Sequence, residues 1–367
     1  MKSLRLTIAL LAALALLPAA CLADPDRLDG DITDATGRWK YSLGEGGATI
    51  TYILEWAEDE VTVPREVDGH PVVAIGDWAF HLCDGIAGVT IPDGVSSIGE
   101  GAFMGCTGLR RASLPNGLMS IGANAFTDCY ELRGIALPRT LASIGELAFD
   151  CAGLEGVYVP PSAADIGEDA FGGCEMSELR GEAGSRAEAY AEESGMGFAA
   201  EAYGGGEALA LASGAKYVFS SGVGGWSNEI SVGAGGEFEG YFHDTDMGDG
   251  GDGYPNGTMY ERRYRGRLEP VGRVDDNTYE FRAALMEADG ELGDERIEGG
   301  VRIIIAPAFG LELGDALVFY AEGSETDYMP LAFSDWMCMP NGWEEIPPEL
   351  PFRALYNATQ GFGFGAY

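Results

Sequence analysis

The sequence is poor in basic residues and in histidine. It has 22 Lys and Arg residues against 59 Asp and Glu residues, a formal net charge of −37, and only three histidines. A field of this sign repels polyanions, so we expect neither a nucleic acid partner nor binding to an anionic lipid surface. The histidines are His70, His81 and His243. They leave few candidates for acid–base catalysis or for a zinc site.

The motifs of the common catalytic classes are also missing. The sequence has no Cys-x-x-Cys pair, no His-Glu-x-x-His segment and no phosphate-binding loop. Ser227 follows Gly225 and Trp226, but Glu229 stands where a nucleophile elbow needs a glycine. Among 59 acidic residues, no pair of carboxylates can be singled out as acid and base. The sequence therefore predicts that the protein is not an enzyme and has no organic cofactor.

Long apolar runs are absent except near the N-terminus. The charged start contains Lys2 and Arg5, an apolar run extends from Leu6 to Leu17, and small residues follow. This order is typical of a secretion signal, so we assign residues 1–23 to a signal peptide. The run is too short to span a membrane as a helix. We expect an exported protein, either secreted or anchored at the cell surface.

Cys21 raises the question of a lipid anchor. A lipoprotein signal ends at a cysteine of this kind, but Pro18 stands where such sites prefer an aliphatic residue. The alternative is ordinary cleavage near Ala20 or Ala23, without a lipid. The residues leave both possibilities open.

What the sequence has in abundance is a repeat. A unit with Leu-Pro, Val-Pro or Ile-Pro, then Ile-Gly, then Ala-Phe, then Cys occurs five times between residues 61 and 179. A period of 22 or 23 residues indicates a solenoid, in which each unit contacts its neighbours and one core runs through the stack. The period is read from the repeat cysteines, which are Cys83, Cys106, Cys129, Cys151 and Cys174.

Each unit predicts one short strand and one turn. In the segment 109–115, Ala112 and Leu114 have the spacing of inward-facing strand residues, and Pro115 ends the strand because it has no N–H group. The Ile-Gly-x-x-Ala-Phe run then carries the chain across the other side. We expect Phe126 and its equivalents to form a continuous aromatic column. We expect the repeat cysteines to be buried, reduced thiols, because side chains of parallel neighbours run alongside each other.

These landmarks, in this order, resemble those of the BspA-like, or treponemal-type, leucine-rich repeat family over residues 61–200. The resemblance implies a solenoid of short parallel strands in a bacterial surface or secreted protein that acts through contacts with other macromolecules. Residues 24–60 are expected to hold a tether and a β-hairpin cap, because two β-rich runs flank Gly44 to Gly47. At the other end, Ser185 precedes the helix-forming segment 186–194, which predicts a second cap.

The rest of the chain predicts a second, all-β domain. Residues 201–215 include a run of three glycines and are expected to be a linker to residues 216–367. Runs of β type separated by Gly, Asp and Asn turns indicate an antiparallel meander, and closure into a barrel would remove its edges. The eight runs are 217–219, 229–232, 237–242, 260–268, 278–286, 301–305, 316–320 and 361–364.

This second domain resembles an uncharacterised lipocalin-like module of exported bacterial proteins. The resemblance is carried by Gly-Gly-Trp-Ser at 224–227, the segment 238–248 and Gly-Tyr-Pro-Asn-Gly-Thr at 253–258. It implies a barrel and brings no activity with it.

One polar cluster is a candidate cation site. Four aspartates stand among glycines between His243 and Gly253, and calcium takes oxygen ligands on a tightly turning backbone. The spacing fits no EF-hand loop, and a solvated hairpin loop explains the same residues. The candidate calcium ligands are Asp244, Asp246, Asp249 and Asp252.

The concave face of the solenoid is the candidate interaction surface. Its strand positions carry mostly small, uncharged side chains, with Arg111 and Tyr158 as the large groups. Tyr and Arg are favoured anchors in protein interfaces, although an ordinary solvated sheet face would look the same. The surface is predicted to comprise Thr90, Arg111, Ser113, Ala136 and Tyr158.

Two functions of different classes follow. The first is a non-catalytic recognition protein, including adhesion, in which the repeats bind an extracellular protein or another surface macromolecule. The alternative is a small-molecule or calcium binding protein that uses the C-terminal barrel. A cavity inside that barrel would favour the alternative, and a filled barrel would favour recognition. The expected lining of such a cavity is Trp226, Tyr241, Phe281 and Phe319.

Overall fold

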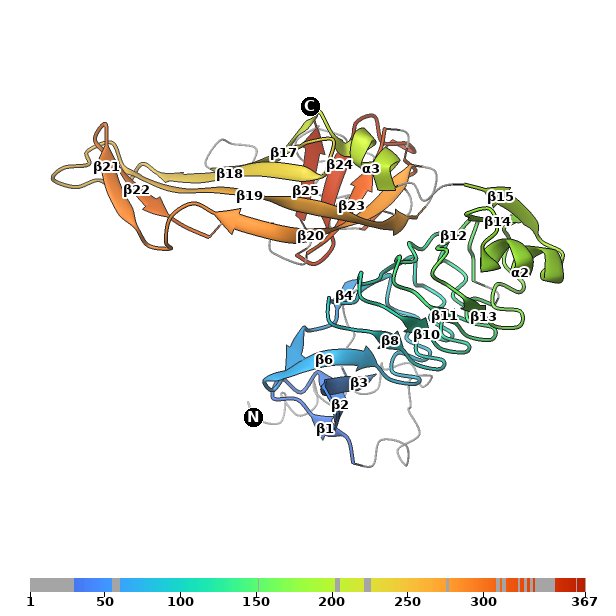
Figure 1. Cartoon of the computed structure of the whole chain (residues 1–367). Coiled ribbons are helices and arrows are strands. Elements are labelled where there is room, and N and C mark those ends of the chain that lie inside the picture. Colours follow the sequence, from blue (N-terminus) through green and yellow to red (C-terminus); the bar gives the residue numbers. More distant parts are fainter. Residues whose placement is uncertain are drawn as a thin grey trace.

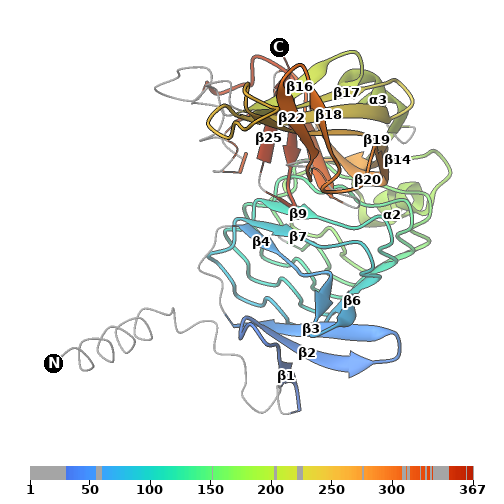
Figure 2. The same cartoon turned by 90° about the vertical axis from the view of Figure 1, so that its left-hand side faces the viewer.

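The computed structural model describes residues 30–54, 60–150, 152–201, 205–220, 226–274, 277–307, 311, 315–322, 324–326, 329–330, 333, 347–360 and 362–366. These residues form a solenoid followed by a closed β-barrel (Figure 1). Figure 2 shows the barrel lying over one side of the solenoid, away from the N-terminal hairpin. The predicted signal peptide, with Cys21, lies outside the described residues.

Two parallel ladders run along the solenoid. The strands expected from the Leu-Pro segments form one ladder, which is interrupted at residues 134–136; it comprises β4 (Glu60–Thr62), β7 (Gly88–Thr90) and β9 (Arg111–Ser113), then β12 (Tyr158–Val159), β14 (Glu178–Gly181) and β15 (Gly197–Ala200). The dipeptide before each Ile-Gly glycine forms the other, which the sequence did not predict; it comprises β6 (His70–Ile75), β8 (Ser97–Ile98), β10 (Ser120–Ile121), β11 (Ser143–Ile144) and β13 (Asp165–Ile166). Equivalent residues pair in register, as Ile121 does with Ile144. The repeat therefore sets the strand register directly.

The predicted aromatic column is present. Phe80, Phe103, Phe126, Phe149 and Phe171 are all buried, and adjacent ring centroids lie 4.8, 5.1, 5.2 and 5.3 Å apart. These spacings are close to the distance of about 4.8 Å between neighbouring strands. The backbone ladder therefore sets the separation of the rings.

The turn before each phenylalanine requires a left-handed residue. The second residue after the Ile-Gly glycine has a positive φ in each of the five units, at 59°, 58°, 55°, 55° and 49°. Glycine, asparagine and aspartate tolerate this conformation best and occupy three of the five positions, whereas the other two hold tryptophan and leucine at a cost in backbone strain. The five residues are Trp78, Gly101, Asn124, Leu147 and Asp169.

The repeat thiols are buried and form hydrogen bonds along the stack. The Sγ atoms of Cys106 and Cys129 donate to the carbonyl oxygens of Phe80 and Phe103, at 3.0 and 3.2 Å. Cys174 makes the equivalent bond but is partly exposed. Cys83, Cys106 and Cys129 are all buried, whereas Cys151 and Cys338 lie outside the described residues.

Both ends of the solenoid are covered. The predicted hairpin is formed by β2 (Trp39–Gly44) and β3 (Gly47–Ile53), and β3 continues the second ladder by pairing with β6. Ile32–Thr33, which the sequence assigned to the tether, forms β1 against β2, and Glu66–Val67 forms β5 against β6. At the other end α2 (Arg186–Ser194) buries Tyr190, whose ring meets Phe171 edge-on at 5.9 Å.

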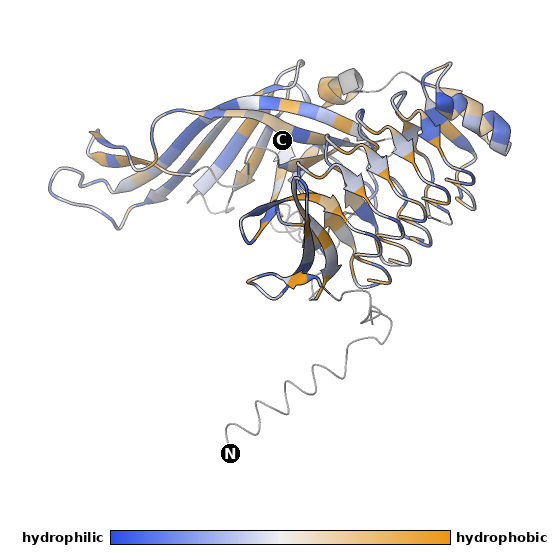
Figure 3. Cartoon of the chain, turned by 60° about the horizontal axis from the view of Figure 1, so that its bottom comes forward, coloured by the Kyte–Doolittle hydropathy of each residue, from blue (hydrophilic) through white to orange (hydrophobic). Residues whose placement is uncertain are grey.

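The C-terminal half is a closed antiparallel barrel. Each of its eight strands pairs with the next one along the chain, and pairing of the first with the last closes the circle. The strands are β16 (Lys216–Ser220), β17 (Trp226–Val232), β18 (Glu237–Asp246), β19 (Thr258–Arg273), β20 (Thr278–Ala288), β23 (Ala316–Tyr320), β24 (Ala354–Asn357) and β25 (Phe362–Ala366). Figure 3 shows hydrophobic and hydrophilic residues alternating along the long strands. Closure and alternation agree with the sequence-based expectation of a barrel.

Two of the predicted barrel strands need correction. The run 301–305 forms β22 (Val301–Ile305), which pairs with β19 and β21 (Glu295–Glu298) in an arm outside the barrel circle. The eighth barrel strand is β24, which the sequence did not predict because it is short and follows proline-rich sequence. All four of its residues are buried, on both faces, so it lacks the alternation that identifies a strand.

Residues of the expected linker belong to the barrel. Segment 205–212 forms α3 (Gly205–Ala212), and Ala208 and Ala212 of this helix are part of the barrel core. The alanine- and leucine-rich composition explains this packing, because it supplies an apolar helix face. Within the described residues, no helix is long and apolar enough to cross a membrane.

Replacing Phe126 by alanine is expected to destabilise the solenoid strongly. The ring is fully buried and stacks on both neighbours, so its loss leaves a cavity and a reduction of about 3–5 kcal/mol in the free energy of unfolding. Urea unfolding of the whole protein followed by circular dichroism measures the change. Met119→Ala, at a side chain that is 56% exposed, is the control and should shift stability by less than about 0.5 kcal/mol. A Phe126→Ala variant as stable as this control would show that the column is not the core.

The repeat thiols are expected to react in a defined order. Cys106 and Cys129 should resist alkylation in the native protein, because both are buried and burial raises the pKa of the Cys129 thiol. Cys174 is partly exposed and should react first. Alkylation followed by peptide mapping, with and without denaturant, measures this order. Native labelling of Cys106 before Cys174 would contradict the packing.

Candidate functional site

The predicted interaction surface is covered by the barrel of the same chain. Its five residues lie on the outward side of the interrupted ladder, and all are buried; they are Thr90, Arg111, Ser113, Ala136 and Tyr158. The outer face of β20, β23 and β24 rests on this ladder. The concave face therefore already contacts a folded protein surface, although that surface belongs to its own chain.

Arg282 of β20 is the central polar anchor of this contact. Its guanidinium Nη2 donates to the carbonyl oxygens of Ile91 and Leu114, at 3.2 and 2.8 Å, and the side chain is 2% exposed. Each acceptor directly follows a strand of the solenoid ladder, β7 or β9. On the same side, the Thr90 hydroxyl donates to the carbonyl oxygen of Ala358 at 3.3 Å. One barrel side chain thus bridges two consecutive turns of the solenoid.

Glu280 lies beside Arg282 in the same interface. The Ser113 hydroxyl donates to its Oε2 at 3.4 Å, and its other oxygen has no hydrogen-bond partner among the described residues. Burial raises the pKa of Glu280 to about 7, although the positive charges of Arg282 and Arg111 act in the opposite direction. The carboxyl group is therefore held partly protonated near neutral pH.

Arg111 is the second buried guanidinium of the interface. Its Nη2 pairs with Glu60, and its Cζ lies 5.7 Å from the centroid of the Tyr356 ring on β24. This cation–π contact connects the solenoid to the barrel. The interface also includes an ion pair between Arg65 and Asp315, at 3.9 Å.

Small residues allow the two backbones to approach closely. A Cβ atom at Gly134 would lie 2.4 Å from the carbonyl oxygen of Val274, and one at Gly272 would lie 2.9 Å from the Cβ of Ala136. Contacts this short are incompatible with a side chain. The glycine at 134 is therefore required by docking, and the solenoid ladder is interrupted at the same place.

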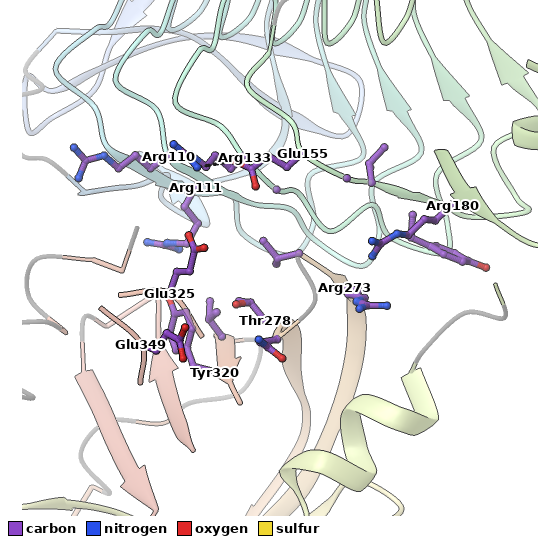
Figure 4. A pocket seen from close by; sticks show the side chains of 17 residues that line it. Arg110, Arg111, Arg133, Glu155, Arg180, Arg273, Thr278, Tyr320, Glu325 and Glu349 are labelled. Carbon is purple, nitrogen blue, oxygen red and sulfur yellow. Dashed lines mark hydrogen bonds and ion pairs between the residues drawn. The ribbon is translucent and has the colours of Figure 1, made fainter. Parts of the chain in front are cut away.

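A cleft of about 480 Å³ lies between the solenoid and the barrel. Figure 4 shows Arg180 and Arg273 on opposite walls, Arg111 further along, and Glu325 and Glu349 on the barrel side. Arginine dominates the charged lining, and these side chains are Arg110, Arg111, Arg133, Arg180 and Arg273. Two of them are paired at the rim, Arg133 with Glu155 at 2.6 Å and Arg273 with Glu201 at 2.8 Å.

Sequence reasoning found only part of this cleft. It included Arg111 and Tyr158 but missed Arg180, which pairs with Tyr158 across the ladder one turn further on. Extending the repeat register by one unit would have identified Arg180. No repeat pattern in the sequence identifies Arg273, because its place in the cleft depends on how the barrel docks onto the solenoid.

The aspartates of the candidate calcium site do not converge. Asp249 pairs with Arg302 and accepts a hydrogen bond from the Thr258 hydroxyl at 2.8 Å, and Asp246 accepts one from the Gly248 amide. Asp244 stands opposite Tyr260 on β19. Among the described residues, no three His, Cys, Asp or Glu side chains are grouped to hold a metal ion. The aspartates, Asp252 included, lie along a hairpin and its loop.

The barrel interior is filled by aromatic side chains. Tyr217, Phe281 and Phe319 are fully buried, and the rings of Tyr217 and Phe281 each meet Phe319 edge-on, at 6.5 and 6.4 Å. Trp226 is half-buried beside Phe219, and Tyr241 lies on the outer face. The four residues expected to line a ligand cavity therefore do not surround one space.

A serine–histidine pair lies on the outer surface of the barrel. Ser227 Oγ is 3.1 Å from His243 Nδ1, and the His243 ring stacks on Tyr241. The two residues are direct neighbours across β17 and β18. This pairing follows from strand register on the outer face of the sheet.

The fold and the repeat define a leucine-rich repeat solenoid with an appended barrel. Residues 73–186 match the model of the BspA type leucine rich repeat region in six copies, one more than the five counted from the sequence. The chain belongs to the BspA-type leucine-rich repeat proteins. A search of curated proteins gives no match.

Solved structures of bacterial leucine-rich repeat proteins resemble the repeat part. One from T. pallidum is 38% identical, with 39% of this chain and 68% of that chain covered and a TM-score of 0.37. One from Bacteroides ovatus is 25% identical, with 39% and 45% covered and a TM-score of 0.36. A leucine rich cell surface protein from Faecalibacterium prausnitzii is 25% identical, with 41% and 54% covered and a TM-score of 0.28. The chain thus spans about half the length of the last two.

The docked state is expected to lose stability as the pH rises from about 4.5 to about 7. The pKa of Glu280 is raised from 4.5 to about 7, so the native state binds more protons than the unfolded state in this interval. The stability that protonation of Glu280 contributes is fully present below the pKa of the unfolded state and is lost above the pKa of the folded state. Its upper limit is about 3 kcal/mol, since one pKa unit corresponds to about 1.4 kcal/mol.

Urea unfolding at about pH 5 and about pH 8 measures this effect. Repulsion among the other acidic residues acts in the same direction, so the comparison is with Glu280→Gln, which removes only this titration. The variant should show a clearly smaller pH dependence than the parent. Equal pH dependence of parent and variant would rule out Glu280 as the titrating group.

Proposed function

We propose that this protein is an exported bacterial recognition protein that binds another protein through its repeat solenoid and catalyses no reaction. The family supports this proposal, because leucine-rich repeats present extended surfaces for protein contacts. One structural neighbour is itself titled a cell surface protein. Segment 1–23, which is typical of a secretion signal, supports export. The exported protein is either anchored by a lipid at Cys21 or released after ordinary cleavage.

The observation that carries the proposal is the contact within the chain. The concave face binds the barrel through backbone carbonyls, hydroxyls and arginine side chains, which are groups that any protein surface can engage. The face therefore has the shape and polarity of a protein-binding surface. The barrel covers the part around β7 and β9 and leaves the part at β14 more open.

We place the external partner on this open end. Glu178 of β14 is exposed, and Arg180 of the same strand and its neighbour Ala199 of β15 are half-buried. The barrel stands beside this end as a second wall, as Figure 4 shows. A partner at this position would contact both domains. Adhesion is one such role, and it requires only that the partner lie on another cell or surface.

Glu178→Arg is expected to weaken binding of the partner by at least about tenfold, because a reversed charge inside an interface opposes its original complement. The immobilised whole protein is exposed to extracellular proteins, and each captured protein is identified and its affinity measured. Glu192→Arg, on α2 outside the concave face and also exposed, is the control and should bind as the parent does.

Two results would contradict the proposal. One is a captured protein that binds Glu178→Arg and the parent equally well. The other is the absence of any saturable protein ligand for the folded whole protein.

A further inference from the structure

The interdomain cleft concentrates positive charge in a strongly acidic protein. Five arginines line it, although the chain has only 22 basic residues against 59 acidic ones. Three glutamates share the lining, and two of these, Glu325 and Glu349, are exposed on the barrel side. A cleft walled by low-dielectric protein focuses the field of such a cluster. The interior of the cleft is thus a place where this protein can attract an anion.

Arg111 gives a second, independent indication that the cleft binds an anion. Its side chain is 8% exposed and lines the cleft, and only Nη2 is engaged, by Glu60. Among the described residues, Nε and Nη1 have no hydrogen-bond partner. Buried donors without acceptors are rare in folded proteins, because each loses its hydration without compensation. An acceptor supplied by a ligand would satisfy both nitrogens.

Arg180 and Arg273 flank the same space from the two domains. Arg180 lies over Gly156, whose missing side chain leaves room on the cleft floor: a Cβ there would be 3.9 Å from the Arg180 Cζ. Arg273 donates to Glu201 through Nη1. A guanidinium has five N–H donors arranged as a planar fork, so one ion pair does not exhaust it. The fork matches a carboxylate in a bidentate arrangement.

The remaining lining points to an organic ligand. Val274 and Val318 contribute apolar side chains, and Tyr320 contributes an aromatic ring. Ligand sites of this volume usually combine such apolar walls with a few polar groups that fix orientation. An inorganic ion would leave these walls uncovered.

We propose that the interdomain cleft binds a small organic carboxylate, which accepts hydrogen bonds from Arg111 and is flanked by Arg180 and Arg273. The carboxylate is either that of a free acid or that of an acidic residue in a peptide, since the same chemistry recognises both. Because the walls belong to different domains, such a ligand binds only the docked arrangement and stabilises it. This site borders the end of the solenoid at which the protein partner is proposed above, and Arg180 belongs to both.

Titration calorimetry on the whole protein tests the proposal, with glutarate and N-acetyl-Glu-Glu-amide as probes. Glutaramide is the neutral isostere of glutarate, and phosphate is the inorganic anion. We expect saturable binding of at least one carboxylate probe, and the stronger of the two identifies the source. Phosphate and glutaramide should bind at least about tenfold more weakly.

Three variants locate the site. Arg180→Gln and Arg273→Gln should each weaken binding by at least about tenfold, because each removes a charged donor. Arg186→Gln, on α2 and also in an ion pair, is the control and should leave binding unchanged. Gly134→Val should abolish binding by separating the walls, while Gly117→Val, where nothing lies within 4 Å of an added Cβ, should not.

The carboxylate should also raise the thermal midpoint of the parent and leave that of Gly134→Val unchanged. Equal binding of glutaramide or phosphate would overturn the proposal. So would unchanged binding in both Arg180→Gln and Arg273→Gln, or no saturable binding of either carboxylate probe. These outcomes leave the protein-partner experiment unaffected, so the two proposals fail separately.

Discussion

The distance between neighbouring turns of the solenoid is the constraint on which the array depends. Parallel backbone ladders fix this distance near 4.8 Å, and every repeated side chain must meet its copy at that spacing. Flat rings satisfy the condition by stacking, as the centroid distances of 4.8–5.3 Å in the phenylalanine column show. The thiols satisfy it by reaching one carbonyl of the preceding unit. The column ends where a ring turns edge-on, at Trp39 and at Tyr190, and there the regular stack stops.

The same geometry explains how the solenoid holds the barrel. A ladder of short strands leaves carbonyl groups at the strand ends that point out of the ladder, and a long donor can bridge two of them. Arg282 does this between Ile91 and Leu114, and Glu280 beside it partly balances the buried charge. Buried charges of this kind define one orientation well because few other arrangements satisfy them, even when their net contribution to stability is small. These buried charges therefore fix the orientation of the barrel on the solenoid more than they stabilise the contact.

The sequence predicted those parts of the structure in which each residue depends on its near neighbours. The repeat register, the phenylalanine column and the Trp39–Ile53 hairpin follow from local periodicity, and the structure contains all three. Closure of the barrel was predicted from the number of runs. Strand β24 was missed because burial on both faces hides the alternation of a strand, whereas β22 was predicted as a strand but pairs outside the barrel circle. The site was the least predictable part. Arg180 was within reach of the repeat pattern, whereas Arg273 and Gly134 gain their roles only from the docking of a domain far away in sequence.

The occupied concave face changes what an outside partner must achieve. A barrel joined covalently to the solenoid acts as a competitor at an effective concentration of about a millimolar, which dilution does not lower. A protein present at about a micromolar would need an intrinsic affinity for Thr90, Ser113 and their neighbours roughly a thousand times higher than that of the barrel. Only the uncovered end of the face is exempt from this competition. The chain thus selects between two kinds of partner, weak ones at the open end and exceptionally tight ones at the covered centre.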